Sequence, residues 1–309
     1  RNKGSAGIDR KTISETWAYL TEGGAKYIRK RLLDGTYRPQ PVLGVKIPKA
    51  DGGERQLGIP TVLDRWIQQA ILQVLTEIYE PQFSDNSFGF RPKRSAHDAI
   101  QQSSRYVADG KYWVVDIDLE KYFDTVNHDR LMQRLSNDIH DKRVLKLIRH
   151  YLQAGLMQDG IVTQRTQGTP QGGPLSPLLS KLVLDELDKE LEQRGHSFTR
   201  YADDCNIYVS SEAAGKRVLA SVTNFLEKKL KLKVNETKSA CDLVSNRQFL
   251  GYRFSVTGEI LLSPKTQTRI KRRIRELTYR NRGCSLDRVI SELNSYLRGW
   301  LQYFKLAKA

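Results

Sequence analysis

The stretch Tyr201-Ala202-Asp203-Asp204 places two adjacent carboxylates between two short runs of strand-forming residues. The flanking runs, 198–201 and 205–209, are rich in aromatic and β-branched residues, which favour strands. We therefore expect a β-hairpin with the acidic pair in its tight turn. Side chains alternate along a strand, so adjacent aspartates normally point apart, whereas in a turn both can approach one metal site. An Asp-rich surface turn is the alternative interpretation.

A second predicted strand that ends in acid lies earlier in the chain, at residues 113–119. Its alternation puts Asp116 and Asp118 on one face. If this strand neighbours the hairpin in one sheet, the carboxylates of Asp118, Asp203 and Asp204 converge. Hard oxygen ligands of this kind select Mg²⁺. Two such ions, about 3.5–4 Å apart, can stabilise the attacking and leaving oxygens of a displacement at phosphorus.

Phosphoryl transfer also needs cations that hold a triphosphate. Residues 42–60 predict a β-hairpin around a turn rich in glycine. If Lys49 pairs with Glu54 in this hairpin, Lys46 and Arg55 fall on the same face and can bind the triphosphate. An ordinary solvated hairpin has the same pattern, so this assignment depends on the motifs downstream.

A loop dense in glycine and proline, residues 168–174, precedes a predicted helix. Glycine permits close approach of the backbone to a ligand, so Gln171 and Gly172 are candidates for a platform under the base. Apolar residues at helical spacing predict a core-facing helix after the loop, and a second such helix earlier in the chain. The two apolar stripes are Leu175, Leu178, Leu179, Leu182, Val183 and Leu187, and Trp66, Ile67, Ala70, Ile71, Val74, Leu75 and Ile78.

The charge of the chain favours a polyanionic partner. Its 309 residues carry a formal net charge of +16, with a pI near 9.7, so nucleic acid is the expected partner. The stretch from Lys265 to Ala309 holds 12 Lys and Arg against 3 Asp and Glu, a net +9. We expect its helical cations to contact RNA phosphates. These predicted contacts are Arg269, Lys271, Arg272, Arg273 and Arg275.

Residues 88–94, Phe-Gly-Phe-Arg-Pro-Lys-Arg, interleave aromatic and basic side chains. Such a loop can stack on a nucleic-acid strand and neutralise its phosphates, which makes Arg91, Lys93 and Arg94 candidate RNA contacts. The same residues can equally anchor the loop to the core.

Composition excludes several other classes of protein. No run of about 18 apolar residues is present and no apolar segment follows Arg1–Gly4, so we expect neither a membrane span nor a signal peptide. Three cysteines and five histidines without metal-like spacing argue against a disulfide framework and against zinc, and fit a reducing cytoplasm. The length allows one large domain or two to three smaller ones. The start without Met is expected of a fragment or a processed chain.

In their order along the chain, these motifs resemble those of the reverse transcriptases. Within that family the chain resembles the group II intron proteins, the bacterial reverse transcriptase–maturases. The resemblance covers nearly the whole chain. It rests on the cationic hairpin, Lys238 and the following stretches: Asp118–Phe123, Phe88–Pro92, Thr169–Pro177, Tyr201–Asp204, Phe249–Tyr252 and Leu297–Trp300.

The resemblance implies an α+β right-hand polymerase fold with an antiparallel palm sheet. It implies fingers at 1–92, a palm at 93–262 with 130–168 returning to the fingers, and the start of a thumb or maturase-specific region at 263–309. It also implies roles for individual residues. These are the metal ligands Asp118, Asp203, Asp204 and the carbonyl of Leu119, the ribose gate Phe123, the triphosphate cations Lys46 and Arg55, the nucleotide platform Gln171 with Gly172, the general acid Lys238, and Asp116 as a supporting acid.

The implied activity is RNA-directed DNA polymerisation. The expected location is cytoplasmic, in a bacterium or in an organelle. The activity would use two Mg²⁺ ions, for which Mn²⁺ is a substitute, together with dNTPs, an RNA template and a DNA primer. The chain would also bind intron RNA and thereby assist splicing and mobility of the intron. A homodimer is compatible with the sequence. Because the chain stops soon after the predicted thumb begins, site-specific DNA cleavage is not expected. The alternatives are a non-catalytic RNA-binding splicing cofactor, a retron, CRISPR-linked or diversity-generating reverse transcriptase, and a palm-fold nucleotide cyclase.

Overall fold

The computed structural model describes residues 4–48, 53–158, 160–169 and 171–308. The chain forms two compact units. Unit 1 consists of Arg1–Ser84, Glu120–Leu187 and Lys228–Lys233, and unit 2 of Asp85–Leu119, Asp188–Glu227 and Val234–Ala309. Each unit combines helices with sheet, and the pairing within the sheet of unit 2 is antiparallel, so the predicted α+β class is confirmed. Within the described residues, no helix has the length and apolar character needed to cross a bilayer.

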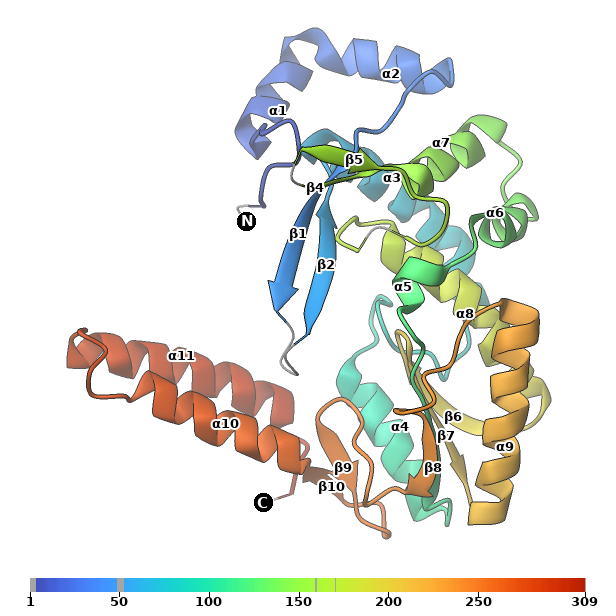
Figure 1. Ribbon diagram of the computed structural model, residues 1–309, viewed down its shortest axis with the longest axis vertical. Coiled ribbons are helices and arrows are strands. Elements are labelled where there is room, and N and C mark those ends of the chain that lie inside the picture. The colour runs from blue at the N-terminus through green and yellow to red at the C-terminus, as the bar shows by residue number, and fades with distance from the viewer. Residues whose placement is uncertain (1–3, 49–52, 159, 170, 309) are drawn as a thin grey trace. The chain divides into compact units, whose positions relative to one another are not determined.

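Unit 1 is built around a four-stranded sheet with strand order β2-β1-β4-β5, drawn in Figure 1. Helix α8 begins in this unit and ends in unit 2, and the π-helical segment η3 also crosses that boundary. The elements are α1 (Ile13–Tyr19), the π-helical segment η1 (Leu20–Gly24), α2 (Ala25–Leu33), β1 (Val42–Pro48), β2 (Glu54–Ile59), α3 (Val62–Tyr79), the 3₁₀ turn η2 (Glu80–Gln82), α5 (Tyr122–Thr125), α6 (His128–Ser136), α7 (Lys142–Gln153), β4 (Leu156–Gln158), β5 (Ile161–Thr163), α8 (Ser176–Gln193) and η3 (Leu226–Leu230).

The predicted hairpin of unit 1 exists, but its expected register was wrong. Strands β1 and β2 pair Lys46 with Gln56 and Ile47 with Arg55. This register is one residue away from the expected one, so positions 46 and 55 alternate instead of sharing a face. Lys49, on which the expected pairing rested, lies with the rest of the turn at 49–52 outside the described residues. The geometric reason for grouping Lys46 with Arg55 therefore falls away.

The buried face of α3 also differs from the predicted stripe. Val74 is 60% exposed, whereas the polar residues Asp64 and Gln68 are buried. The Asp64 carboxylate accepts hydrogen bonds from the hydroxyls of Tyr37, at 2.8 Å, and Tyr151, at 3.2 Å. Burial raises the pKa of Asp64, and these donors offset part of that cost. Apolar periodicity could not reveal this polar network, because its members lie far apart in the sequence.

Unit 2 contains a four-stranded antiparallel sheet with strand order β6-β7-β3-β8 and a separate hairpin, β9–β10. Helix α9 packs against β3, β7 and β8, whereas α4 packs against β6, β7 and β9, on the other side of the sheet (Figure 1). The elements are α4 (Ala96–Ala108), β3 (Trp113–Ile117), β6 (Ser197–Tyr201), β7 (Asp204–Val209), α9 (Glu212–Phe225), β8 (Ala240–Leu243), β9 (Tyr252–Phe254), β10 (Ile260–Leu262), α10 (Pro264–Leu277) and α11 (Leu286–Phe304).

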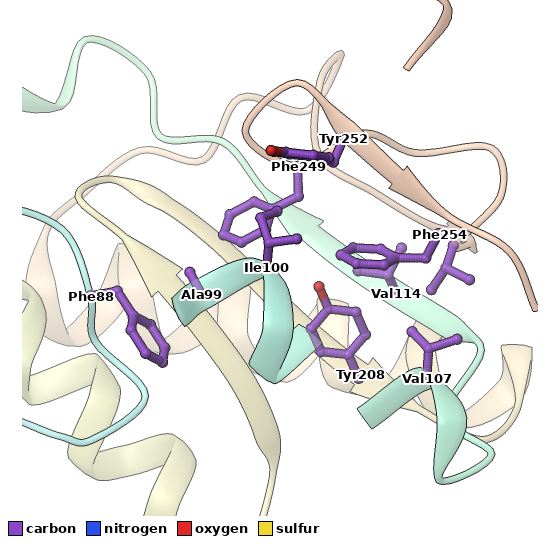
Figure 2. Close-up of a cluster of buried hydrophobic side chains, with 10 residues drawn as sticks. Phe88, Ala99, Ile100, Val107, Val114, Tyr208, Phe249, Tyr252 and Phe254 are labelled. Carbon is purple, nitrogen blue, oxygen red and sulfur yellow. The ribbon is translucent and has the colours of Figure 1, made fainter. Parts of the chain in front are cut away.

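The core of unit 2 joins the sheet to α4 and to the β9 region, as Figure 2 shows. Val114 of β3 and Tyr208 of β7 are partners across the strand pair and pack with residues of α4. Asp116 follows Val114 by two positions, so it occupies the same face of β3. One face of this strand pair is therefore apolar at one end and acidic at the other. The buried cluster consists of Phe88, Ala99, Ile100, Val107, Val114, Tyr208, Val244, Phe249, Tyr252 and Phe254.

Replacing glycine by alanine should change the free energy of unfolding in opposite directions at two helical positions, Gly215 and Gly299. A Cβ on Gly215, in α9, would lie 2.2 Å from the Cys241 Sγ, whereas a Cβ on Gly299, in α11, would meet no atom within 4 Å. Gly215→Ala should lower the free energy of unfolding by about 1–3 kcal/mol through overpacking. Gly299→Ala should raise it by up to about 1 kcal/mol, because alanine is the better helix former. Chemical denaturation measures both, and equal effects would contradict the packing of α9 on the sheet.

Candidate active site

The acidic turn joins β6 and β7 through two residues. Tyr201 pairs with Asp204, so Ala202 and Asp203 form the loop of the hairpin. The predicted hairpin is therefore present, but the expectation that both aspartates lie in its turn was wrong. Asp203 is in the turn, whereas Asp204 pairs with Tyr201 and is the first residue of β7. Ala202 has a φ of 59°, in the left-handed region that non-glycine residues rarely occupy. This conformation has to be held by neighbouring groups.

Asp118 lies directly after β3, beside the hairpin. Strands β3 and β7 are hydrogen-bonded neighbours, with Ile117 opposite Cys205, so the expected adjacency of the two acidic strands is confirmed. The backbone of Asp118 is held on both sides. Its N–H donates to Ser239 Oγ at 2.9 Å, and its carbonyl accepts from Asn235 N at 2.8 Å. These bonds fix the end of β3 against the segment that follows η3.

Asp116 is paired with a cation that sequence reasoning missed. The Arg247 guanidinium donates to Asp116 Oδ2 through Nε at 3.0 Å and through Nη2 at 2.6 Å. Nη2 also donates to the carbonyl of Lys238, at 2.6 Å. Lys238 in turn places its Nζ 3.9 Å from Asp118 Oδ2. Arg247 therefore ties the backbone of Lys238 to β3, and no local sequence pattern singled it out.

The carboxylates influence one another strongly. Burial, followed by the charges of Asp116, Asp203 and Asp118, raises the pKa of Asp204 well above its ordinary value. Burial also raises the pKa of Asp116, although Arg247 partly opposes this. Like charges at close range in a partly buried site disfavour ionisation, so this acidic cluster destabilises the chain that carries it. A bound cation would relieve that cost.

A pocket of about 730 Å³ in unit 2 is lined by these carboxylates and by several cations. The donor set fits a hard divalent ion, because carboxylate oxygens of Asp118, Asp203 and Asp204 border one space. As the side chains stand, the described residues contain no group of three His, Cys, Asp or Glu side chains spaced to hold one ion. The carboxylates are therefore of the right chemical type for a divalent metal, but their side chains are not positioned to coordinate one together. The basic side chains of the pocket are Lys238, Arg247, Arg253 and Lys265.

The predicted nucleotide residues gather in unit 1, apart from Leu119, which borders the pocket of unit 2. Gly58 N donates to the Gln171 carbonyl at 2.7 Å, and a Cβ on Gly172 would lie 2.4 Å from the Gly58 carbonyl. Thr169 N donates to the Phe123 carbonyl at 2.6 Å. The loop at 168–174 is thus fastened to β2 on one side and to α5 on the other. Pro170 of that loop is outside the described residues.

The two predicted triphosphate cations lie on the two strands of the unit 1 hairpin, Lys46 on β1 and Arg55 on β2. Lys46 forms an exposed ion pair with Glu54 at 3.0 Å, so its ammonium is already paired on the hairpin. Arg55 is opposite Ile47 in the strand pair. Triphosphate binding by both residues stays a prediction.

The candidate RNA contacts fall into two groups. Arg91 is only 8% exposed and donates to the Ser87 carbonyl at 2.8 Å, which favours the anchoring role of its loop. Lys93 is exposed, and Arg94 is ion-paired with Asp85. All five candidate cations of α10 are exposed, although Arg272 and Arg273 pair with Glu276. The α10 surface therefore offers the more accessible basic patch.

Asp204→Asn should stabilise the metal-free protein while removing a candidate ligand. Because the folded-state pKa of Asp204 is raised, its ionised form destabilises the fold at neutral pH and not below its ordinary pKa near 4. In EDTA at pH 7.5 we expect a higher melting temperature, by about 2–4 °C for each kcal/mol of relieved repulsion. The gain should shrink as the pH is lowered towards 4. A melting temperature below wild type at pH 7.5, with exposed Glu236→Gln unchanged as the control, would contradict the electrostatic account.

Comparison with known proteins assigns the family. The family model described as "Reverse transcriptase (RNA-dependent DNA polymerase)" matches residues 47–254, and that described as "Group II intron, maturase-specific domain" matches residues 267–309. Protein YkfC of Escherichia coli is 35% identical over 266 residues, covering 73% of this chain and 70% of YkfC. The group II intron-encoded protein LtrA of Lactococcus lactis is 40% identical over 200 residues, covering 64% of this chain.

A structural comparison agrees with this assignment at the level of fold. Telomerase from Candida albicans superposes with a TM-score of 0.57 at 15% identity, covering 93% of this chain. The matched region spans 57% of that telomerase chain and 33% of LtrA. The fold, the acidic strands and the family match over residues 47–254 agree: the chain belongs to the reverse transcriptase family, and its residues 267–309 match the group II intron maturase-specific domain.

Proposed function

We propose that this chain transfers a nucleotidyl group from a dNTP to the 3′-OH of a primer, copying an RNA template. The observation that carries the proposal is the pairing of β3 with β7, which brings Asp118 beside Asp203 and Asp204. Reverse transcriptases generally use divalent metal ions, and Mg²⁺ is the ion that this oxygen-rich donor set favours. When bound, such ions would supply Lewis-acid stabilisation of the attacking and leaving oxygens.

The remaining tasks fall to side chains of this chain. Asp118, Asp203 and Asp204, with the Leu119 carbonyl, are proposed to supply the metal ligands. Lys238 is proposed to hold a proton at Nζ for the leaving pyrophosphate, since its ammonium lies at the edge of the acidic cluster.

In unit 1, Gln171 and Gly172 are proposed to support the base, Phe123 to exclude a ribose 2′-OH, and Lys46 and Arg55 to hold the triphosphate. The domain roles are likewise proposals: fingers at 1–92, palm at 93–262 with 130–168 in the fingers, and thumb from 263.

Intron RNA is the proposed macromolecular partner. The basic face of α10 and the match to a maturase-specific domain both favour a bound RNA. A chain that only binds and folds RNA is therefore the second candidate function. The maturase-specific region favours an intron protein over a retron, CRISPR-linked or diversity-generating enzyme, and the family match removes the nucleotide cyclase. A homodimer stays a proposal, as does activity in the bacterial or organellar compartment where the intron is transcribed.

Removing one proposed metal ligand separates the two candidate functions. Asp203→Asn and Asp118→Asn should each abolish primer extension, because the amide cannot replace the carboxylate charge. Affinity for structured RNA should change by less than tenfold, about 1.4 kcal/mol, since phosphate contacts lie on the basic surface. Extension assays and a binding titration at fixed salt measure both on one preparation. Exposed Asp109→Asn serves as the matched control. Normal extension by the mutants would refute the metal assignment and favour the RNA-binding function.

Phe123 gives a second, independent test of the polymerase assignment. Phe123→Val removes the bulk that is proposed to exclude the 2′-OH, so ribonucleotides should enter while much of the dNTP activity is retained. We expect the ratio of kcat/KM for dNTP over rNTP to fall at least about tenfold, which corresponds to 1.4 kcal/mol. Steady-state extension with single nucleotides measures the ratio, with the exposed aromatic variant Tyr112→Val as the control. An unchanged ratio would remove Phe123 from the gate.

A further inference from the structure

We propose that Arg200 is a positioning residue that fixes the peptide between Ala202 and Asp203 and thereby aims the Asp203 carboxylate. The proposal rests on the proposed function, because it gives Asp203 its role. It goes further by assigning the orientation of the acidic turn to a buried ion pair outside the pocket. The pocket-lining residues do not include Arg200 or its partner Asp188.

Arg200 is buried in the middle of unit 2 with its charge fully engaged. Arg200 is 1% exposed and Asp188, on α8, is 0% exposed. The guanidinium donates to Asp188 through Nε, at 2.6 Å, and through Nη2. Nη2 also donates to Ser87 Oγ at 2.8 Å. The remaining nitrogen, Nη1, donates to the carbonyl of Ala202 at 2.7 Å.

That last hydrogen bond selects one of two turn geometries. In a two-residue hairpin loop, types I′ and II′ both have a positive φ at the first position. They differ by a flip of the central peptide, which makes φ positive at the second position only in type I′. Ala202 has a positive φ and Asp203 does not, as in type II′. Donation from Arg200 to the Ala202 carbonyl holds the central peptide in this state, so a flip would rotate the backbone that carries the Asp203 side chain.

The surroundings of the turn are built to support the same state. Arg200 N donates to the Asn86 carbonyl at 2.9 Å, and Phe88 N donates to the Arg200 carbonyl at 2.8 Å. A Cβ on Gly89 would lie 2.3 Å from Ala202 N, so the segment from Asn86 to Gly89 lies directly against the turn. This segment leaves the turn little room to move, and the hydrogen bond from Arg200 fixes the orientation of the peptide between Ala202 and Asp203.

The buried Arg200–Asp188 ion pair is not expected to contribute much to stability, so its presence calls for another explanation. Burying two charges costs several kcal/mol per ion, and replacing such a pair with apolar residues is often neutral or stabilising. Packing alone would therefore tolerate an apolar pair at positions 200 and 188. An apolar side chain cannot donate to the Ala202 carbonyl, and that donation is the function we assign to Arg200.

The test is the double variant Arg200→Met with Asp188→Leu, which removes both charges and leaves neither partner buried alone. We expect a folded protein with a melting temperature close to wild type. The kcat for primer extension should fall about 10²-fold through misplacement of Asp203, with the KM for dNTP little changed. The dissociation constant for Mn²⁺, followed by electron paramagnetic resonance without substrate, should rise about 10-fold or more.

Two further variants keep the outcome decisive. Arg200→Lys retains a cation beside Asp188 but cannot span to the Ala202 carbonyl, so it should show the same losses even if the double variant fails to fold. Ser103→Ala is the control. It removes a fully buried hydroxyl of α4 that hydrogen-bonds, at 2.9 Å, to Thr199, the residue before Arg200 on β6, and it should leave kcat and Mn²⁺ affinity unchanged. Either folded Arg200 variant with wild-type kcat and Mn²⁺ affinity would overturn the proposal.

The proposed function fails separately from this inference. If Asp203→Asn extends primers normally, the metal assignment is wrong whatever Arg200 does. If wild type extends primers and Asp203→Asn does not, the function stands, and the Arg200 variants decide the positioning role alone. If wild type does not extend primers, the change in Mn²⁺ affinity still decides whether Arg200 orients the turn.

Discussion

Mutual repulsion among Asp116, Asp118, Asp203 and Asp204 is the constraint on which the architecture of unit 2 depends. Antiparallel pairing of β3 with β7 brings the backbones of these aspartates together, and the like charges of the aspartates oppose that pairing. The surrounding chain offsets the repulsion with cations and backbone bonds. Arg247 neutralises Asp116, and Asn235 and Ser239 clamp the backbone of Asp118. Such a cluster lowers stability for the sake of function, a trade common at functional sites.

The local patterns of the sequence predicted the elements that carry this site. Alternation over residues 113–119 placed Asp116 and Asp118 on one face, and strand-forming residues on both sides of Asp203 predicted the hairpin. Both features depend only on neighbours in the chain, so they are readable without a structure. The adjacency of β3 and β7 required a sheet topology that periodicity does not encode, and the family resemblance favoured it. The apolar stripe of α8 was confirmed for the same local reason.

The predictions that were wrong, and the partner that could not be predicted, depend on contacts between residues far apart in the sequence. The predicted register of β1 and β2 was wrong by one residue, because it was inferred from one assumed cross-strand pair, Lys49 with Glu54, whereas the whole strand sets the register. The buried side of α3 was misjudged because Asp64 finds donors in Tyr37 and Tyr151, which lie in other segments. Arg200 carried a visible signal, a charged residue inside a predicted strand, but its partner on α8 could not be identified from the sequence.

The loop at residues 88–94 illustrates how structure changes the meaning of a motif. Aromatic and basic residues there fitted both a nucleic-acid surface and an anchor to the core. Phe88 joins the core cluster, Arg91 donates to the Ser87 carbonyl, and Gly89 lies against Ala202 of the acidic turn. The loop therefore supports the turn from outside the pocket. A substitution in it would disturb the acidic turn even without touching RNA, so loss of activity alone cannot assign Arg91 to an RNA interface. The exposed cations of α10 do not share this ambiguity, because they lie on the helix surface away from the turn's hydrogen bonds.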